Sequence, residues 1–191
     1  FQKAYIELNG EINMYKIKKS LKPSGLLGIS DKQIDDHWKL YEGYVKQVNN
    51  LSKTETHRYG FEYNGMILHE YYFENLTSSK TSLSESLLKK TIEQTWGSIE
   101  SWKQDFIKTG KSRGIGWAIL YADPKTKKLT HHFAREHQSG HVTGFTPILV
   151  MDVWEHAYMV DHQADGRSAY IEHFMQNIDW DVVAKRYSSD P

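Results

Sequence analysis

The sequence contains no cysteine. Disulfides, thiolate nucleophiles, iron–sulfur clusters and zinc–thiolate sites are therefore excluded. No run of about 18 apolar residues occurs, so we expect no membrane-spanning helix. Neither sign of charge is in excess, because Lys+Arg and Asp+Glu number 24 each. That balance argues against general binding to nucleic acid or to anionic membranes.

Histidine, by contrast, is plentiful, with 10 residues in the chain of 191. Since thiolates are absent, any transition-metal site here must use imidazole and carboxylate ligands. The hydrophobic residues (39%) suffice for a real core, so disorder is not expected. The chain begins with Phe1 rather than Met. A cytoplasmic location and, after removal of a leader, a periplasmic or secreted one therefore both stay open.

The N-terminal half carries helical patterns. Ser30 followed by Gln33 is the capping-box pattern that opens a helix. Apolar residues at helical spacing predict a long helix over about 31–55 and a second one over about 59–76. We expect these two helices to pair as a hairpin, preceded by a polar arm and followed by a Ser/Thr/Lys-rich linker at about 77–84.

The second half mixes helices and strands. Helical spacing over about 83–110 predicts one helix, or two separated at Gly97. Apolar runs typical of buried strands follow at about 116–122, 129–134 and 147–153. The helical period resumes at Trp154, and a last helix is expected near 180–187. The predicted fold class is α+β: an N-terminal helical hairpin, then a small antiparallel sheet of about three strands with helices.

The sharpest local signal is the motif DVWEHAY, which begins at Asp152. An apolar strand delivers Asp152 at its end, and His156 follows four residues later. At a strand-to-helix junction both side chains could turn toward one point, and a carboxylate with a neutral imidazole suits iron or manganese. An equally simple interpretation is an Asp that caps the next helix beside a buried, hydrogen-bonded His.

Two further histidines, His37 and His69, lie inside the two predicted N-terminal helices. Each alone is more often a core or half-exposed histidine than a ligand. On paired helices they could supply two more ligands to the same ion. Three His and one Asp would leave open coordination for solvent and a small substrate, which suits redox catalysis better than a closed structural site.

The stretch TPILVMDVWEHAY at residues 146–158 resembles the signature of iron/manganese superoxide dismutases. Other segments are similar to the same family, among them GIGW at 114–117, NGMILHEYYF at 64–73 and YIEHF at 170–174. The resemblance implies one iron or manganese ion per subunit, bound by His37, His69, Asp152 and His156. It also implies that superoxide is the substrate and is converted to dioxygen and hydrogen peroxide. The ligands are the same for iron and manganese, so the sequence does not distinguish them.

The resemblance further implies a hydrogen-bond donor to the metal-bound solvent. In the family this donor comes from the second ligand helix or from the sheet region. The helix position is Gly65 here and can donate nothing, so we expect the donor at His137, where the family usually has Gln. Gln138 is the near alternative. Trp117 and Trp154 are expected to wall the metal pocket.

Two features concern the rim of the implied site. Tyr44 is similar to the family's gateway tyrosine, but Leu40 stands where the family commonly has His, and the spacing from the first ligand is one residue shorter. Tyr41 is therefore the alternative gateway. Glu155 resembles the family's subunit bridge, in which each Glu bonds the ligand His of the other subunit, so we expect a homodimer joined by Glu155 and His156.

Superoxide dismutase is thus the leading functional hypothesis. Its alternative is a catalytically weak or non-enzymatic metal-binding relative with the same fold, which Leu40 favours. A peroxide-directed redox activity at the same site is a further alternative. A purely protein-binding helical module would leave four convergent ligands unexplained. We expect two units, residues 1–78 with the arm and hairpin and residues 79–191 with the α+β part, and the metal site between them.

Overall fold

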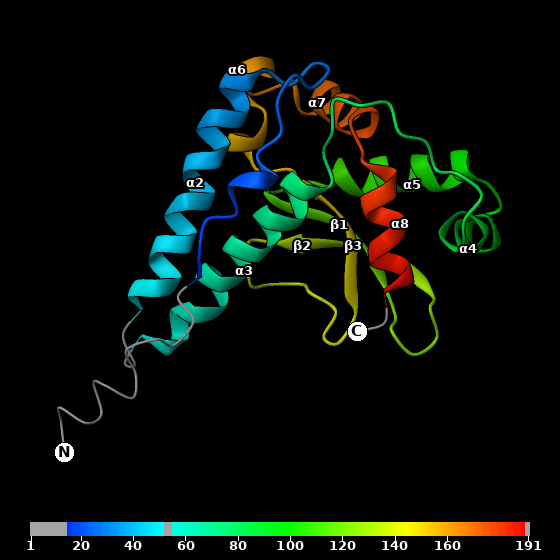
Figure 1. Ribbon diagram of the computed structural model, residues 1–191, viewed down its shortest axis with the longest axis horizontal. Coiled ribbons are helices and arrows are strands. Elements are labelled where there is room, and N and C mark those ends of the chain that lie inside the picture. The colour runs from blue at the N-terminus through cyan, green and yellow to red at the C-terminus, as the bar shows by residue number, and fades with distance from the viewer. Residues whose placement is uncertain (1–14, 52–54, 190–191) are drawn as a thin grey trace.

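The computed structural model describes residues 15–51 and 55–189 (Figure 1). Residues 1–14 of the predicted N-terminal arm lie outside the described residues. The part of the arm that is described contains a short 3₁₀ helix, η1 (Lys19–Leu21). Two long helices follow it, and then a three-stranded sheet with shorter helices around it. This is the α+β architecture predicted from the sequence.

The N-terminal hairpin consists of α2 (Asp31–Asn50) and α3 (Thr56–Glu74), which pack against each other. The predicted cap is confirmed, because the Ser30 hydroxyl accepts a hydrogen bond from the backbone N–H of Gln33 at 3.1 Å. The side chains that α2 buries recur at helical spacing: Ile34, His37, Trp38, Tyr41, Val45 and Val48. A histidine thus lies within the apolar face of α2 and faces α3.

Helices α4 (Leu87–Trp96) and α5 (Ile99–Gly110) occupy the segment predicted as one or two helices. Gly97 separates them in a left-handed conformation with φ +82°. Glycine adopts this conformation without the steric cost that a Cβ imposes. The predicted boundary between two units, at residues 78–79, lies in the segment between α3 and α4.

The sheet contains β1 (Gly116–Ala122), β2 (Leu129–Arg135) and β3 (Thr146–Asp152), antiparallel in the order β2-β1-β3. Every residue of the central strand β1 is buried. Helix α3 packs on β3, whereas α5 packs on β1 and β2. In the β1–β3 register Trp117 pairs with Asp152, so the sheet places an indole beside the carboxylate at the end of β3.

The chain after β3 differs from the prediction. The sequence predicted that the helical period resumes at Trp154, but the segment forms only a 3₁₀ turn, η2 (Glu155–Ala157), and a four-residue helix, α6 (Met159–His162). The Trp154 N–H donates to a carboxylate oxygen of Asp152, and Gln163 ends α6 at φ +57°.

Regular helix returns in α7 (Arg167–Gln176) and α8 (Trp180–Ser188), the latter as predicted. Among the described residues, no helix combines the length and the apolar character that a bilayer span requires.

Candidate metal centre

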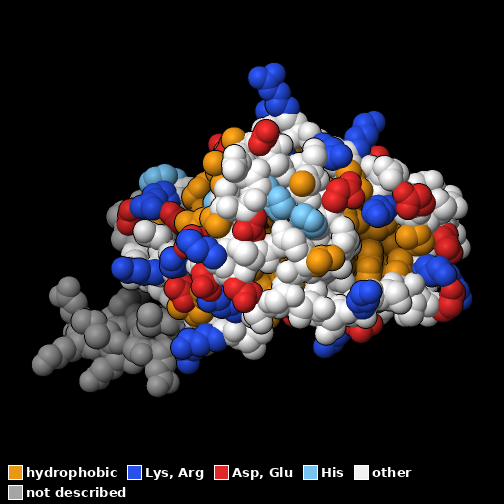
Figure 2. Space-filling view, turned by 90° about the horizontal axis from the view of Figure 1, so that it is seen from above, with side chains coloured by type: hydrophobic (Ala, Val, Ile, Leu, Met, Phe, Trp, Pro, Cys, Tyr) orange, Lys and Arg blue, Asp and Glu red, His pale blue; other side chains and the backbone are white. Residues whose placement is uncertain are grey.

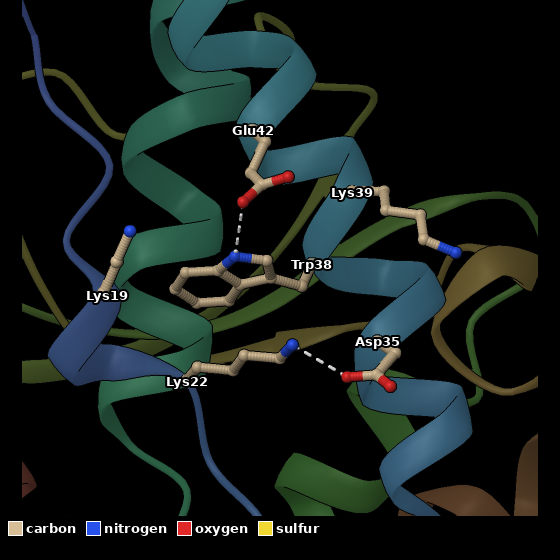
Figure 3. Close-up of a pocket in the computed structure, with 6 residues that line it drawn as sticks. All are labelled: Lys19, Lys22, Asp35, Trp38, Lys39 and Glu42. Atoms are coloured by element: carbon tan, nitrogen blue, oxygen red, sulfur yellow. Dashed lines mark hydrogen bonds and ion pairs between the residues drawn. The ribbon is translucent and has the colours of Figure 1, made fainter.

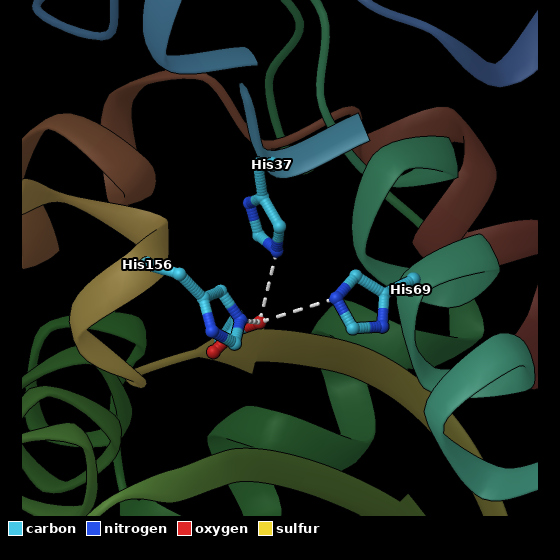
Figure 4. A group of neighbouring side chains, drawn as sticks. His37, His69 and His156 are labelled. Atoms are coloured by element: carbon cyan, nitrogen blue, oxygen red, sulfur yellow. Dashed lines mark hydrogen bonds and ion pairs between the residues drawn. The ribbon is translucent and has the colours of Figure 1, made fainter. Parts of the chain in front are cut away.

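Four side chains from different elements converge between the hairpin and the sheet (Figure 4). Oδ2 of Asp152 lies 3.1 Å from Nε2 of His37, 3.1 Å from Nε2 of His156 and 3.9 Å from Nε2 of His69. Each residue offers one ligand atom, and these four atoms all lie within 4.8 Å of one another. The structure therefore brings together the four residues predicted as ligands.

The tautomer of His69 indicates that this cluster binds a cation. Its Nδ1 lies 2.6 Å from the carbonyl oxygen of Gly65, which can only accept, so the neutral ring carries its proton on Nδ1. Its Nε2 is buried and has no hydrogen-bond partner among the described residues. The lone pair of this nitrogen therefore faces the Asp152 carboxylate. Two buried lone pairs at 3.9 Å are stabilised by a cation between them, and the donor set suits iron or manganese.

Electrostatics keep these groups in the forms that bind metal. Burial lowers the pKa of the His37 and His69 imidazoles, which favours neutral rings. Burial of Asp152 opposes its ionisation, but the charge and hydrogen bond of His156 and the hydrogen bond of His37 outweigh it and lower its pKa. The Asp152 carboxylate and the neutral rings of His37 and His69 can therefore bind a cation without first losing a proton.

Further hydrogen bonds hold Asp152 and its surroundings. Its other carboxylate oxygen, Oδ1, accepts the N–H of Trp154 at 2.8 Å. Its backbone carbonyl accepts the buried Tyr170 hydroxyl at 2.7 Å. Sequence analysis did not identify Tyr170 as a contributor, although it lies in one of the segments that resemble the family. Its partner is 18 residues away in the chain, and no local pattern reveals that contact.

Gln33 is a second residue that sequence analysis placed but did not connect to the site. The capping-box pattern predicts that its side chain turns back to the helix start. The structure instead buries it, with Nε2 donating to the backbone carbonyl of His156 at 2.7 Å and Oε1 accepting the N–H of Val160 at 2.9 Å. Gln33 thereby ties the turn that carries His156 to α2.

His137 lies beside this cluster and is fully buried. Its Nδ1 accepts the indole N–H of Trp117 at 3.1 Å, and its Nε2 lies 2.7 Å from the Tyr44 hydroxyl. Because an indole N–H only donates, the neutral ring carries its proton on Nε2. Burial lowers the pKa of His137 to about 4 and raises that of Tyr44 to about 12, so both groups are uncharged at neutral pH.

The alternatives named from the sequence lie elsewhere. Gln138 is exposed, and its amide donates to the Glu136 carboxylate at 2.9 Å. The Tyr41 hydroxyl donates to the buried Glu70 carboxylate at 3.0 Å, whereas the Tyr44 ring lies 5.2 Å from the His69 ring. The geometry therefore groups Tyr44 and His137 with the four predicted ligands and leaves Tyr41 and Gln138 outside.

The two predicted wall residues border the same space. The Trp154 ring stacks on both His137, at 5.1 Å between centroids, and His156, at 5.7 Å. The Trp117 ring packs edge-on against His69 at 5.2 Å. These indoles exclude water from two sides of the cluster.

A cavity of about 480 Å³ at the surface of α2 is a second candidate site, and its chemistry differs from that of the histidine cluster (Figure 3). It is lined by Lys19, Lys22, Asp35, Trp38, Lys39 and Glu42. Four of these six residues pair with one another: Lys22 with Asp35 at 2.7 Å, and the Trp38 indole, which donates to Glu42 at 3.0 Å. The convergent lone pairs of the histidine cluster make that cluster the better functional site.

Comparisons with known proteins agree with this geometry. The model of the C-terminal domain of iron/manganese superoxide dismutases matches residues 84–186. The chain is 33% identical to "Superoxide dismutase [Fe]" of Cupriavidus metallidurans, over 92% of this chain and 98% of the relative. It is 33% identical to "Superoxide dismutase [Fe]" of Aquifex pyrophilus, over 89% of each chain. It is 37% identical to "Superoxide dismutase [Mn]" of Haloarcula marismortui, over 64% of this chain and 60% of the relative.

Proposed function

The chain belongs to the iron/manganese superoxide dismutase family, and from this premise we propose that His37, His69, Asp152 and His156 hold its single metal ion. The protein is a superoxide dismutase, and its cofactor is iron or manganese. When bound, that ion supplies the one-electron chemistry that converts superoxide to dioxygen and hydrogen peroxide. The observation that carries the ligand assignment is the buried, partnerless Nε2 of His69 facing the Asp152 carboxylate.

We propose that His137 and Tyr44 provide the hydrogen-bond donors beside the proposed metal ligands. The resemblance expects a donor at His137; its Nε2–H is directed at the Tyr44 oxygen 2.7 Å away, and Trp117 fixes this tautomer by donating to Nδ1, so we assign the donor role to the linked pair of His137 and Tyr44. The raised pKa of Tyr44 keeps its hydroxyl protonated at neutral pH. Superoxide reduction consumes protons, so protonated groups beside the ligands serve this reaction.

We also propose a homodimer in which Glu155 bonds the ligand His156 of the other subunit. Glu155 is exposed, and the His156 side chain keeps 25% of its surface accessible. Large apolar side chains close by in the chain are exposed as well, with Met159 at 42% and Val160 at 45%. Figure 2, seen from the side where α6 lies in Figure 1, shows hydrophobic and histidine side chains at the surface among charged ones. A second copy would cover these groups and complete the support of His156.

The function is tested by loading the metal-free protein with iron or with manganese and measuring metal content and superoxide consumption together. Protein that retains one ion per chain should consume superoxide, with turnover proportional to the bound metal. One metal is expected to support faster turnover than the other, because the same ligands poise the two ions at different potentials. Loaded protein that consumes superoxide no faster than the metal-free form would contradict the proposal.

A further inference from the structure

The backbone carbonyl of His137 accepts hydrogen bonds from two side chains that come from different parts of the fold. Asn64 on α3 donates its amide at 2.9 Å. His141 lies in the loop between β2 and β3, and its Nε2 is 2.7 Å from the same carbonyl oxygen of His137. The sequence analysis gave neither residue a role, and neither contacts the four proposed ligands in the contacts described above.

The loop that carries His137 requires such support. The preceding residue, Glu136, has φ +56°, and Gly140 has φ +87°. A left-handed conformation costs a residue with a Cβ roughly 1–2 kcal/mol. The conformation at Glu136 determines in which direction the next side chain projects. Contacts that hold the loop in this conformation therefore hold the His137 ring.

The protonation of His141 follows from its partners. Since a carbonyl only accepts, Nε2 of the neutral ring carries the proton and donates to His137. Nδ1 then accepts the hydroxyl of Tyr121 at 2.7 Å. Tyr121 is 2% exposed and belongs to the central strand β1. A rigid strand thus orients the imidazole that holds the loop.

We propose that His141 and Asn64 are positioning residues that set the place of the His137 ring between Trp117 and Tyr44. The ring must satisfy two hydrogen bonds at once, at 3.1 Å and 2.7 Å, and a displaced backbone cannot keep both. The inference deepens the proposed function, because its catalytic consequence depends on the role of His137. The predicted effect on the position of the His137 ring does not depend on a bound metal.

The first test uses the metal-free protein and nuclear magnetic resonance. In the wild type the Trp117 indole N–H should exchange slowly with solvent, and the ¹⁵N shifts of His137 should report a proton on Nε2. His141→Leu removes a donor to the carbonyl, and loss of one such bond should speed indole exchange about fivefold. His141→Gln keeps an N–H donor at a similar reach and should restore slow exchange. Tyr121→Phe leaves the donor to His137 in place but removes the bond that orients it, so it should speed indole exchange less than His141→Leu.

Asn64→Ala provides a second variant at a half-buried position, in case the leucine variant does not fold. It removes the other donor and should produce the same change in the same two signals. Wild-type exchange and wild-type His137 shifts in either folded variant would overturn the inference.

The second test uses metal-loaded protein. His141→Leu should retain its metal yet lose turnover and shift the reduction potential, and His141→Gln should recover both. An inactive loaded wild type would refute the proposed function but leave the resonance result standing. A leucine variant with altered indole exchange and unaltered potential would refute the catalytic consequence alone.

Discussion

Replacement of Gly65 by Ala tests how closely Tyr44 packs against α3. A Cβ at this position would lie 2.7, 2.9 and 3.0 Å from three ring carbons of Tyr44. Optimal carbon–carbon contacts are roughly 3.5–4.0 Å, so the ring must move by roughly 0.8 Å. Its hydroxyl is held 2.7 Å from His137, so that movement strains the hydrogen bond as well.

The expected magnitude is a balance of two terms. Ala instead of Gly in a helix interior stabilises by about 1 kcal/mol, and overpacking a well-packed site costs about 1–3 kcal/mol. Gly65→Ala should therefore lower the free energy of unfolding by about 0–2 kcal/mol. Gly43 is the matched control, because it lies exposed in α2 and an added Cβ meets nothing within 4 Å. Gly43→Ala should raise the free energy of unfolding by about 1 kcal/mol and Tm by about 2–4 °C.

Urea unfolding of the metal-free protein, at one protein concentration for all variants, measures both changes. The two glycines share the same helix-propensity gain, so the difference between the variants isolates the contact with Tyr44. If Gly65→Ala stabilises the protein as much as Gly43→Ala, Tyr44 does not pack against α3 as described.

Four further predictions concern individual side chains. His69→Ala should abolish metal binding, whereas His57→Ala, at an exposed position of the same helix, should keep the metal. Elemental analysis after dialysis compares the two variants, and full metal occupancy in His69→Ala would contradict the ligand assignment. His137→Ala should keep the metal but shift the reduction potential and lower turnover, and His137→Gln should recover most of the loss; wild-type values in the alanine variant would make His137 a bystander. Glu155→Ala should lower the dimer fraction in sedimentation, and a wild type that is monomeric at micromolar concentration would contradict the proposed bridge. Burial lowers the pKa of His131 from 6.5 to about 4, so the unfolded state takes up the proton first, and stability that is complete above about pH 6.5 is lost as pH falls toward 4. This shift corresponds to about 3 kcal/mol, and His131→Gln should flatten the dependence of the urea midpoint on pH over that window; equal slopes would refute this.

Much of the fold was predictable because its signals are local. The Ser30 cap lies three residues from the N–H that it satisfies, and Gly97 marks a left-handed helix end. The apolar run in β1 is buried along its whole length, which is why composition alone identified it. The segment after Trp154 was predicted wrongly: it forms a 3₁₀ turn and a four-residue helix that ends at Gln163, which has φ +57°, and apolar spacing does not reveal this backbone conformation.

The residues that converge at the site were predictable from the sequence, but the hydrogen bonds that position them were not. Choosing between His137 and Gln138 requires the backbone direction at Glu136, which depends on contacts with α3 and with β1. Gln33 and its partner His156 are 123 residues apart in the chain. Such long-range bonds leave no periodicity in a single sequence, so only the folded arrangement reveals them.

The bonds that join Trp117, His137 and Tyr44 give this group of side chains a polarity. The indole can only give a hydrogen, so the imidazole receives at Nδ1 and gives at Nε2. The phenolic oxygen of Tyr44 then receives from the imidazole, and its own hydrogen must point to a different acceptor. The N–H of Trp117 thus points toward His137, and the N–H of His137 points toward Tyr44, so the donors follow one direction away from the buried sheet. A proton can leave this row only at its tyrosine end.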